Sequence, residues 1–105
     1  MILAHIMANN QAQALDIIRL LMDKKLLLQA AISEKIIFQK KAENGEMVRE
    51  KRTLIIGKTK ALLFSTINEV LKTSFKDKMP MLYAVPIIYM DDSLAHLLRE
   101  NTAKV

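Results

Sequence analysis

The spacing of apolar residues at the start of the chain predicts a strand followed by a helix. Residues 2–8, ILAHIMA, form an apolar run with the length of a strand. Asn9 or Asn10 can cap the helix that follows, because an Asn side chain accepts from the free N–H groups of a first turn. The helix then has one apolar stripe that ends before Lys24 and Lys25, made of Ala14, Leu15, Ile18, Leu21 and Met22.

The middle of the chain predicts a long hairpin and a second helix. Residues 26–41 have a strand-like pattern, and residues 47–58 return as the second strand. Between them, Asn44-Gly45 indicates a type I′ turn, since both residues tolerate a positive φ. Thr59 is placed to cap the next helix. The apolar face of that helix is formed by Leu63, Ile67, Val70 and Leu71.

The last third predicts one more strand, MPMLYAVPIIYM at 79–90, and a short helix. Asp92 or Ser93 caps that helix, which is anchored by Leu94, Leu97 and Leu98. With right-handed crossovers, this order gives an α+β fold of the ferredoxin-like βαββαβ type. We expect a four-stranded antiparallel sheet with both main helices on one face, a short C-terminal helix, and a single domain over residues 1–105.

Four strand segments place apolar side chains on both faces of this sheet. They are ILAHIM, IIF, TLII and VPIIYM. An antiparallel sheet covered on one side normally alternates apolar and polar residues, because its other face meets water. An apolar second face would exceed the few hundred Å² that monomers usually expose. We therefore expect that further copies of the chain cover it.

Two prolines interrupt the last predicted strand. Pro80 stands at its start, where a missing N–H is tolerated, and Pro86 within it indicates an edge position or a bulge. Two interpretations remain open. A bent edge strand could pair with another subunit, or it could simply bend at the edge of a monomer.

Composition narrows the class of protein. The chain has 105 residues, of which 51% are hydrophobic, and no apolar run approaches the roughly 20 residues of a membrane span. The N-terminus lacks a basic leader, so we expect a cytoplasmic protein. The absence of Cys excludes disulfides, thiolate metal sites and a cysteine nucleophile.

A net charge of +5 permits contact with nucleic acid. The basic residues are spread along the chain, however, and aromatic residues are only 5%, too few to interleave a stacking platform with the charge. We therefore expect solvated lysines and no nucleic-acid partner, and nucleic-acid binding is kept as a rival function.

Four stretches, in this order, resemble the CutA-type divalent-cation tolerance proteins: LLMDKKLLLQAAI, TLIIGKTKALLFSTINEVLK, PMLYAVPI and SLAHLLREN. In that family a proline begins the last main strand, and a second follows six residues later before an apolar residue, as Pro80, Pro86 and Ile87 do here. The family's apolar strand running into a Lys-Thr pair is similar to residues 54–59. The likeness extends over nearly the whole chain.

The resemblance implies a homotrimer of ferredoxin-like subunits, with sheets packed edge to edge around a three-fold axis and extended strands shared between subunits. It also implies a function in tolerance of, or response to, divalent metals such as copper. Such a protein would act by binding or assembly and not by catalysis.

The chain departs from the family at the residues proposed to hold copper. The family's Cys after the first helix is replaced by Leu28-Gln29-Ala30, and its His-Pro-Tyr-Glu run by FKDKM at 75–79. The Trp of its hairpin has no counterpart. The resemblance therefore assigns no metal ligand to this chain, and we expect no cofactor.

Other candidate ligands have simpler structural explanations. Met79 and Met81 flank Pro80 and could hold Cu(I), but Met is a common packing residue. His5 shares a strand face with Leu3 and Met7, without a second ligand at a suitable spacing, and is expected to be buried and hydrogen-bonded. We expect His96 to be solvated and Asp91-Asp92 to serve as a helix cap.

The sequence contains no catalytic motif. Gly57 in IIGKT lacks the spaced glycines of a phosphate loop, and no serine-nucleophile motif is present, so we expect no enzyme. An alternative to metal tolerance is a PII-like trimer that senses a small ligand. Its candidate anion site is Lys35, Lys58 and Lys60.

Overall fold

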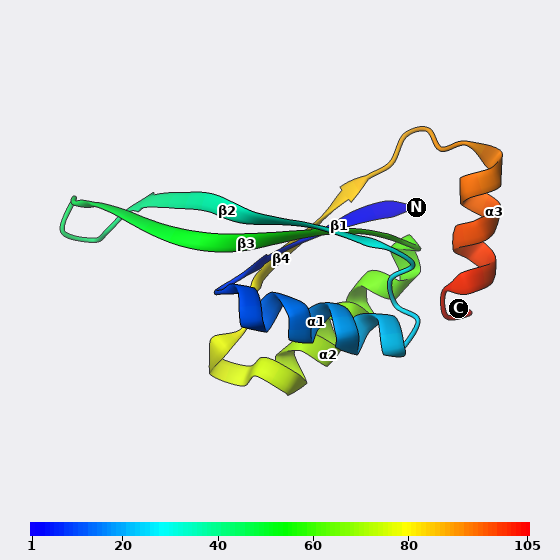
Figure 1. The fold of residues 1–105 in the computed structure, drawn as a ribbon, viewed down its shortest axis with the longest axis horizontal. Coiled ribbons are helices and arrows are strands. Elements are labelled where there is room, and N and C mark those ends of the chain that lie inside the picture. The colour runs from blue at the N-terminus through cyan, green and yellow to red at the C-terminus, as the bar shows by residue number, and fades with distance from the viewer.

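The computed structural model describes residues 1–105, and its elements follow the predicted order (Figure 1). The strands are β1 (Ile2–Ala8), β2 (Ala30–Lys41), β3 (Met47–Thr59) and β4 (Met81–Pro86). The helices are α1 (Gln11–Asp23), α2 (Phe64–Phe75) and α3 (Asp92–Asn101), and two short 3₁₀ turns, η1 (Ala61–Leu63) and η2 (Lys76–Lys78), flank α2. None of the helices has the length and apolar character needed to cross a bilayer.

The four strands form one sheet in the order β2-β3-β1-β4, with every neighbouring pair antiparallel. Figure 1 shows α1 and α2 on the same side of this sheet, while α3 stands at the end where both termini lie. This arrangement confirms the predicted ferredoxin-like α+β fold.

The core lies between the sheet and the two main helices. Alternate residues of β1 point into it, and Ala4, Ile6 and Ala8 are fully buried. The helices and β3 complete it with Ile17, Leu21, Ile55, Ile67 and Leu71, all without exposed surface. Fully burying one such large side chain stabilises the fold by about 1.5–3 kcal/mol, so these residues hold the helices to one face.

The apolar stripe of α1 is centred differently from the prediction. Ile17 is fully buried, whereas Leu15, which we placed in the stripe, is 49% exposed. Ala14, Ile17 and Leu21 follow the three- and four-residue steps of one helix face, and Leu15 lies roughly a third of a turn away from it. The predicted cap is confirmed at Asn10, whose side chain accepts from the Gln13 N–H at 2.8 Å.

Thr59 is the last residue of β3 and not a helix cap, so that prediction is wrong. Its hydroxyl is buried and donates to the Leu26 carbonyl at 2.6 Å. Nearby, a Cβ on Gly57 would stand 2.8 Å from the Leu27 methyl groups, so the absence of a side chain lets the 26–29 connection pack closely. This connection also explains why β2 begins at Ala30 and not at Leu26.

The β2–β3 hairpin closes with a different turn from the predicted type I′. Only Gly45 has a positive φ, at 88°, and Asn44 does not. The Gly45 N–H donates to the Ala42 carbonyl at 2.9 Å, and the Ala42 N–H donates to the Glu46 carbonyl at 2.8 Å. These bonds describe a three-residue loop with a left-handed glycine as its last residue.

β4 is shorter than predicted and lies at an edge of the sheet. Pro80 precedes it, and Pro86 is its last residue, so the predicted edge position is confirmed. The bulge lies instead in β2, between Ser33 and Ile36. Residues 87–91 lie outside the strand, and Asp91 accepts from the Ser93 N–H at 3.0 Å. The cap is therefore within the predicted Asp91-Asp92 pair, and the prediction of Asp92 or Ser93 was placed one or two residues too late.

Candidate functional site

The face of the sheet that points away from α1 and α2 is largely apolar, and we call it the open face. β1 contributes Leu3, His5 and Met7, which alternate with the buried core residues and are half-buried. Strand pairing places beside them, on β3 and β4, Leu54, Ile56, Met81, Tyr83 and Val85. The prediction of apolar side chains on both faces is thus confirmed for β1, β3 and β4, although residues 87–90 of the predicted segment VPIIYM lie outside β4.

The register arranges the open face in rows. Leu54, Met7 and Met81 form one row, and Ile56, His5 and Tyr83 form the next. Met81 is 46% exposed and Tyr83 48% exposed. Figure 1 shows no helix over this side of β1. A broad apolar surface is therefore open to a partner.

His5 and Tyr83 are the polar centre of the open face. The His5 Nδ1 lies 3.2 Å from the Tyr83 hydroxyl, and the two rings are tilted with centroids 5.1 Å apart. The predicted hydrogen bond of His5 is confirmed, although its side chain is only half-buried. Because Nδ1 is engaged, Nε2 is the nitrogen left for another ligand.

The β2–β3 hairpin beyond the bulge, residues 36–52, projects from the body, and we call it the arm (Figure 1). It makes the molecule elongated, with extents of 48 × 28 × 20 Å. Ile37 and Met47 on the arm are 64% and 58% exposed. The Arg52 guanidinium lies over the Phe38 ring, 5.2 Å from its centroid, at the base of the arm.

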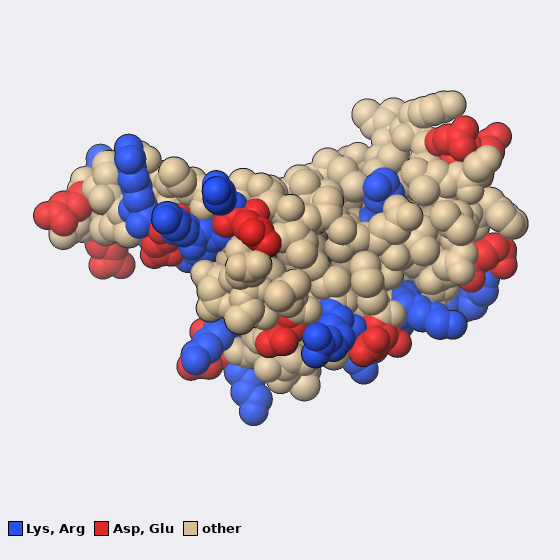
Figure 2. Space-filling view, in the orientation of Figure 1, with Lys and Arg blue, Asp and Glu red and all other residues tan.

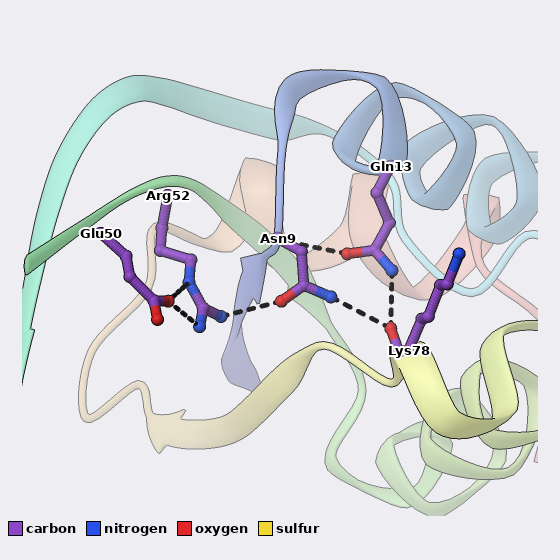
Figure 3. A network of polar contacts seen from close by, with 5 residues as sticks. All are labelled: Asn9, Gln13, Glu50, Arg52 and Lys78. Carbon is purple, nitrogen blue, oxygen red and sulfur yellow. Dashed lines mark hydrogen bonds and ion pairs between the residues drawn. The ribbon is translucent and has the colours of Figure 1, made fainter. Parts of the chain in front are cut away.

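Figure 3 shows a polar network that joins the arm to the body. Arg52 donates to Glu50 within β3 and to the Asn9 side-chain oxygen at 2.9 Å. The side-chain amides of Asn9 and Gln13 both donate to the Lys78 carbonyl, at 3.2 and 2.7 Å. The network thus links β3, the β1–α1 junction and the turn before β4.

The ion pair in this network lowers the pKa of one carboxyl group, that of Glu50. Hydrogen bonding from the Arg52 guanidinium, together with its charge, lowers the pKa of the Glu50 carboxyl below its ordinary value of 4.5. Glu50 therefore stays ionised and keeps its bond to Arg52 over a wider pH range. This favours an architectural role for the network.

The structure does not gather the three lysines of the candidate anion site. Lys35, Lys58 and Lys60 line three separate hollows of the surface. The Lys60 ammonium also donates to the Thr102 and Ala103 carbonyls, at 3.4 and 2.9 Å. The geometry gives no support to an anion site built from these three residues.

A hollow of about 490 Å³ lies between η1 and the C-terminal end of α3, and it was not predicted from the sequence. Arg99, Glu100 and Lys104 line it together with Lys60. Lys104 lies 3.7 Å from the Glu100 carboxylate. No sequence motif marks this hollow, because it forms only where α3 folds back beside η1.

The remaining candidate ligands are dispersed. Met79 packs against the helix-side core, His96 is exposed on α3, and Asp91 is a helix cap, as expected. No three His, Cys, Asp or Glu side chains lie together in a way that could hold a metal ion. The residues of one chain therefore do not fit the oxygen- and nitrogen-rich site that a divalent ion prefers.

No protein-family model and no curated protein sequence matches the chain. Solved structures match it over almost its whole length. The Cut A1 divalent cation tolerance protein from Thermus thermophilus is 24% identical with a TM-score of 0.87, and the match covers 98% of this chain and 100% of that one. CutA1 from Oryza sativa is 19% identical with a TM-score of 0.89, covering 99% and 94%.

A third structure, from Archaeoglobus fulgidus, is described as a periplasmic divalent cation tolerance protein CutA. It is 22% identical with a TM-score of 0.85, covering 96% of this chain and 98% of that one. The chain therefore has the fold of the CutA1 divalent cation tolerance proteins, and the resemblance predicted from sequence is confirmed at the level of the fold.

Proposed function

We propose that this chain is a CutA-type protein that assembles into a homotrimer and serves divalent-metal tolerance or response, in the cytoplasm, by binding and assembly and not by catalysis. The observation that carries the proposal is the open face. Fold alone does not give function, whereas an apolar surface of this kind requires a partner to cover it.

The open face is expected to be buried against another molecule. A face rich in Leu, Ile, Met and Tyr is stabilised when water is removed from it, by about 25 cal/mol per Å² of apolar surface. A sister copy is the occupant that fits best, because an apolar face of this breadth is typical of surfaces between subunits. The fold shared with the CutA1 proteins supports this choice.

The arm supports the same conclusion independently. A two-stranded ribbon is marginally stable in water when nothing packs against it. The arm nevertheless carries exposed Ile37 and Met47 outside the body of its own chain. A neighbouring subunit would supply the missing packing, and extended strands shared between subunits would place the arm against it.

The non-catalytic part of the proposal rests on the absence of a built reaction centre. The polar groups of the open face include the His5–Tyr83 pair, Lys58 and Arg52 on β3, and Ser33, the β2 partner of Leu54. None of these forms a nucleophile–base pair with an orienting group. The lack of Cys agrees with a reducing compartment such as the cytoplasm.

Light scattering coupled to size exclusion tests the proposal. We expect about three times the 12.0 kDa mass of one chain. Tyr83→Lys places a charge on the open face and is expected to give a folded protein of lower mass, because burying the ammonium in an interface is costly.

Leu15→Lys is the matched control for this variant. Leu15 is 49% exposed, close to the 48% of Tyr83, but it lies on α1, away from the open face. We expect Leu15→Lys to keep the mass of the wild type. A wild-type mass of one chain, or an equal loss of mass in both variants, would contradict the proposal.

A further inference from the structure

The open face brings two donors of β1, His5 and Met7, together with Met81 of β4, which is distant in the sequence. Met7 and Met81 are direct partners across β1 and β4. His5 is two residues from Met7 on the same strand and therefore points to the same face. Cβ atoms of such facing pairs lie about 4.5–5.5 Å apart, so the long Met side chains can converge beside the imidazole.

The donor set is soft. Two thioethers and one imidazole are ligands that select Cu(I) over harder ions, whereas carboxylates and carbonyls suit Mg²⁺ and Ca²⁺. No carboxylate lies in the rows of His5 and Met7. We propose that His5, Met7 and Met81 form a binding site for a soft monovalent cation, namely Cu(I).

The hydrogen bond of His5 prepares the imidazole for this role. When Nδ1–H donates to the Tyr83 hydroxyl, 3.2 Å away, Nε2 keeps the lone pair that binds a metal. A hydrogen bond on the second ring nitrogen is the usual way in which proteins orient a metal-binding histidine. Tyr83 is thus a positioning residue.

The surroundings favour a monovalent ion. Leu54 and Ile56 flank Met7 and His5 on β3. The charged side chains on this face are Lys58, opposite Leu3, and Arg52, whose guanidinium is held by Glu50 and Asn9. An apolar environment disfavours the more strongly hydrated divalent ions, which need charged ligands to leave water.

This inference rests on one part of the proposed function, namely that the chain binds metal. All three donors come from one chain, so the site does not need assembly. A sister copy on the open face would keep water and oxidants away from the bound ion.

Competition with a chromogenic Cu(I) chelator, under anaerobic and reducing conditions, measures the affinity for Cu(I). Met7→Leu and Met81→Leu conserve volume, so both variants are expected to fold. Each should weaken Cu(I) binding by more than about tenfold, and His5→Gln should do the same. Met79→Leu removes a thioether that packs on the helix side and should bind like the wild type.

X-ray absorption at the copper edge provides the second readout. We expect two sulfur ligands and one nitrogen ligand in the wild type, and the loss of one sulfur in Met81→Leu. Equal affinity in wild type and Met7→Leu, or a copper site with oxygen and nitrogen ligands only, would overturn the inference.

The same samples separate this inference from the proposed function. A trimer that binds no Cu(I) refutes the soft-ion site and leaves the assembly intact. A monomer that binds Cu(I) through His5, Met7 and Met81 refutes the assembly and leaves the site.

Discussion

Thr59 illustrates how a single side chain can have a different role from the one its neighbours indicate. A threonine before an apolar helical stretch is typical of an N-cap. Here it is the last residue of β3, and its hydroxyl donates to the carbonyl of Leu26, a residue 33 positions earlier. Local sequence does not contain that partner, so the capping prediction could not have been corrected from the pattern.

Thr59→Val should destabilise the protein. Valine keeps the shape of threonine but leaves the buried Leu26 carbonyl without this donor, which costs about 1–3 kcal/mol. Urea unfolding at a fixed protein concentration measures the change in the free energy of unfolding.

Thr66→Val on the exposed side of α2 is the control for Thr59→Val, and it should change the free energy by no more than about 0.5 kcal/mol. If both variants unfold at the wild-type urea concentration, the hydrogen bond of Thr59 does not contribute to stability.

The arm carries apolar residues, Ile37 and Met47, that its own chain leaves exposed. Its strands pair from Ile36–Arg52 to Lys41–Met47, and Figure 1 shows no helix against the projecting hairpin. The network of Arg52, Asn9 and Gln13 fixes its base to the body. An element that is anchored at its base and apolar farther out is expected to pack against another subunit.

Ile37→Lys should weaken assembly while the subunit stays folded. Ile37 is 64% exposed, so a lysine is accommodated in a single chain, but its ammonium would lose water in an interface. We expect the concentration at which the oligomer dissociates to rise by about tenfold or more. Analytical ultracentrifugation over a dilution series measures this, with Leu15→Lys as control; an unchanged dissociation would place the arm outside the interface.

At the scale of the whole molecule, the placement of charge bears on the rival prediction of nucleic-acid binding. Figure 2 shows Lys and Arg interspersed with Asp and Glu along the arm and over the helix side, with a broad uncharged area between them. On the side of the molecule that Figure 2 shows, the basic residues form no continuous stripe of the kind that nucleic-acid-binding proteins present.

Assembly and stability should be linked in the whole molecule. If sister copies cover the open face, only the folded state binds them, so mass action raises the melting temperature with concentration. Differential scanning fluorimetry over an about hundredfold concentration range should show this rise in the wild type and a smaller one in Tyr83→Lys. A melting temperature independent of concentration would indicate that folding and assembly are uncoupled.

The sequence by itself determined the element order and the fold class. Apolar spacings of two and of three to four are local properties, and they placed β1, α1 and the hairpin nearly where the structure has them. The excess of apolar residues on both strand faces was also visible in sequence, because side chains alternate strictly along a strand.

Only the tertiary structure decided which residues meet. Met7 and Met81 are 74 positions apart, and strand register alone makes them neighbours. Register also put Tyr83 beside His5 and separated Lys35 from Lys58 and Lys60. The physical reason is that periodicity reports which face a side chain takes, while contacts across a sheet depend on hydrogen bonds between strands that the local pattern does not encode.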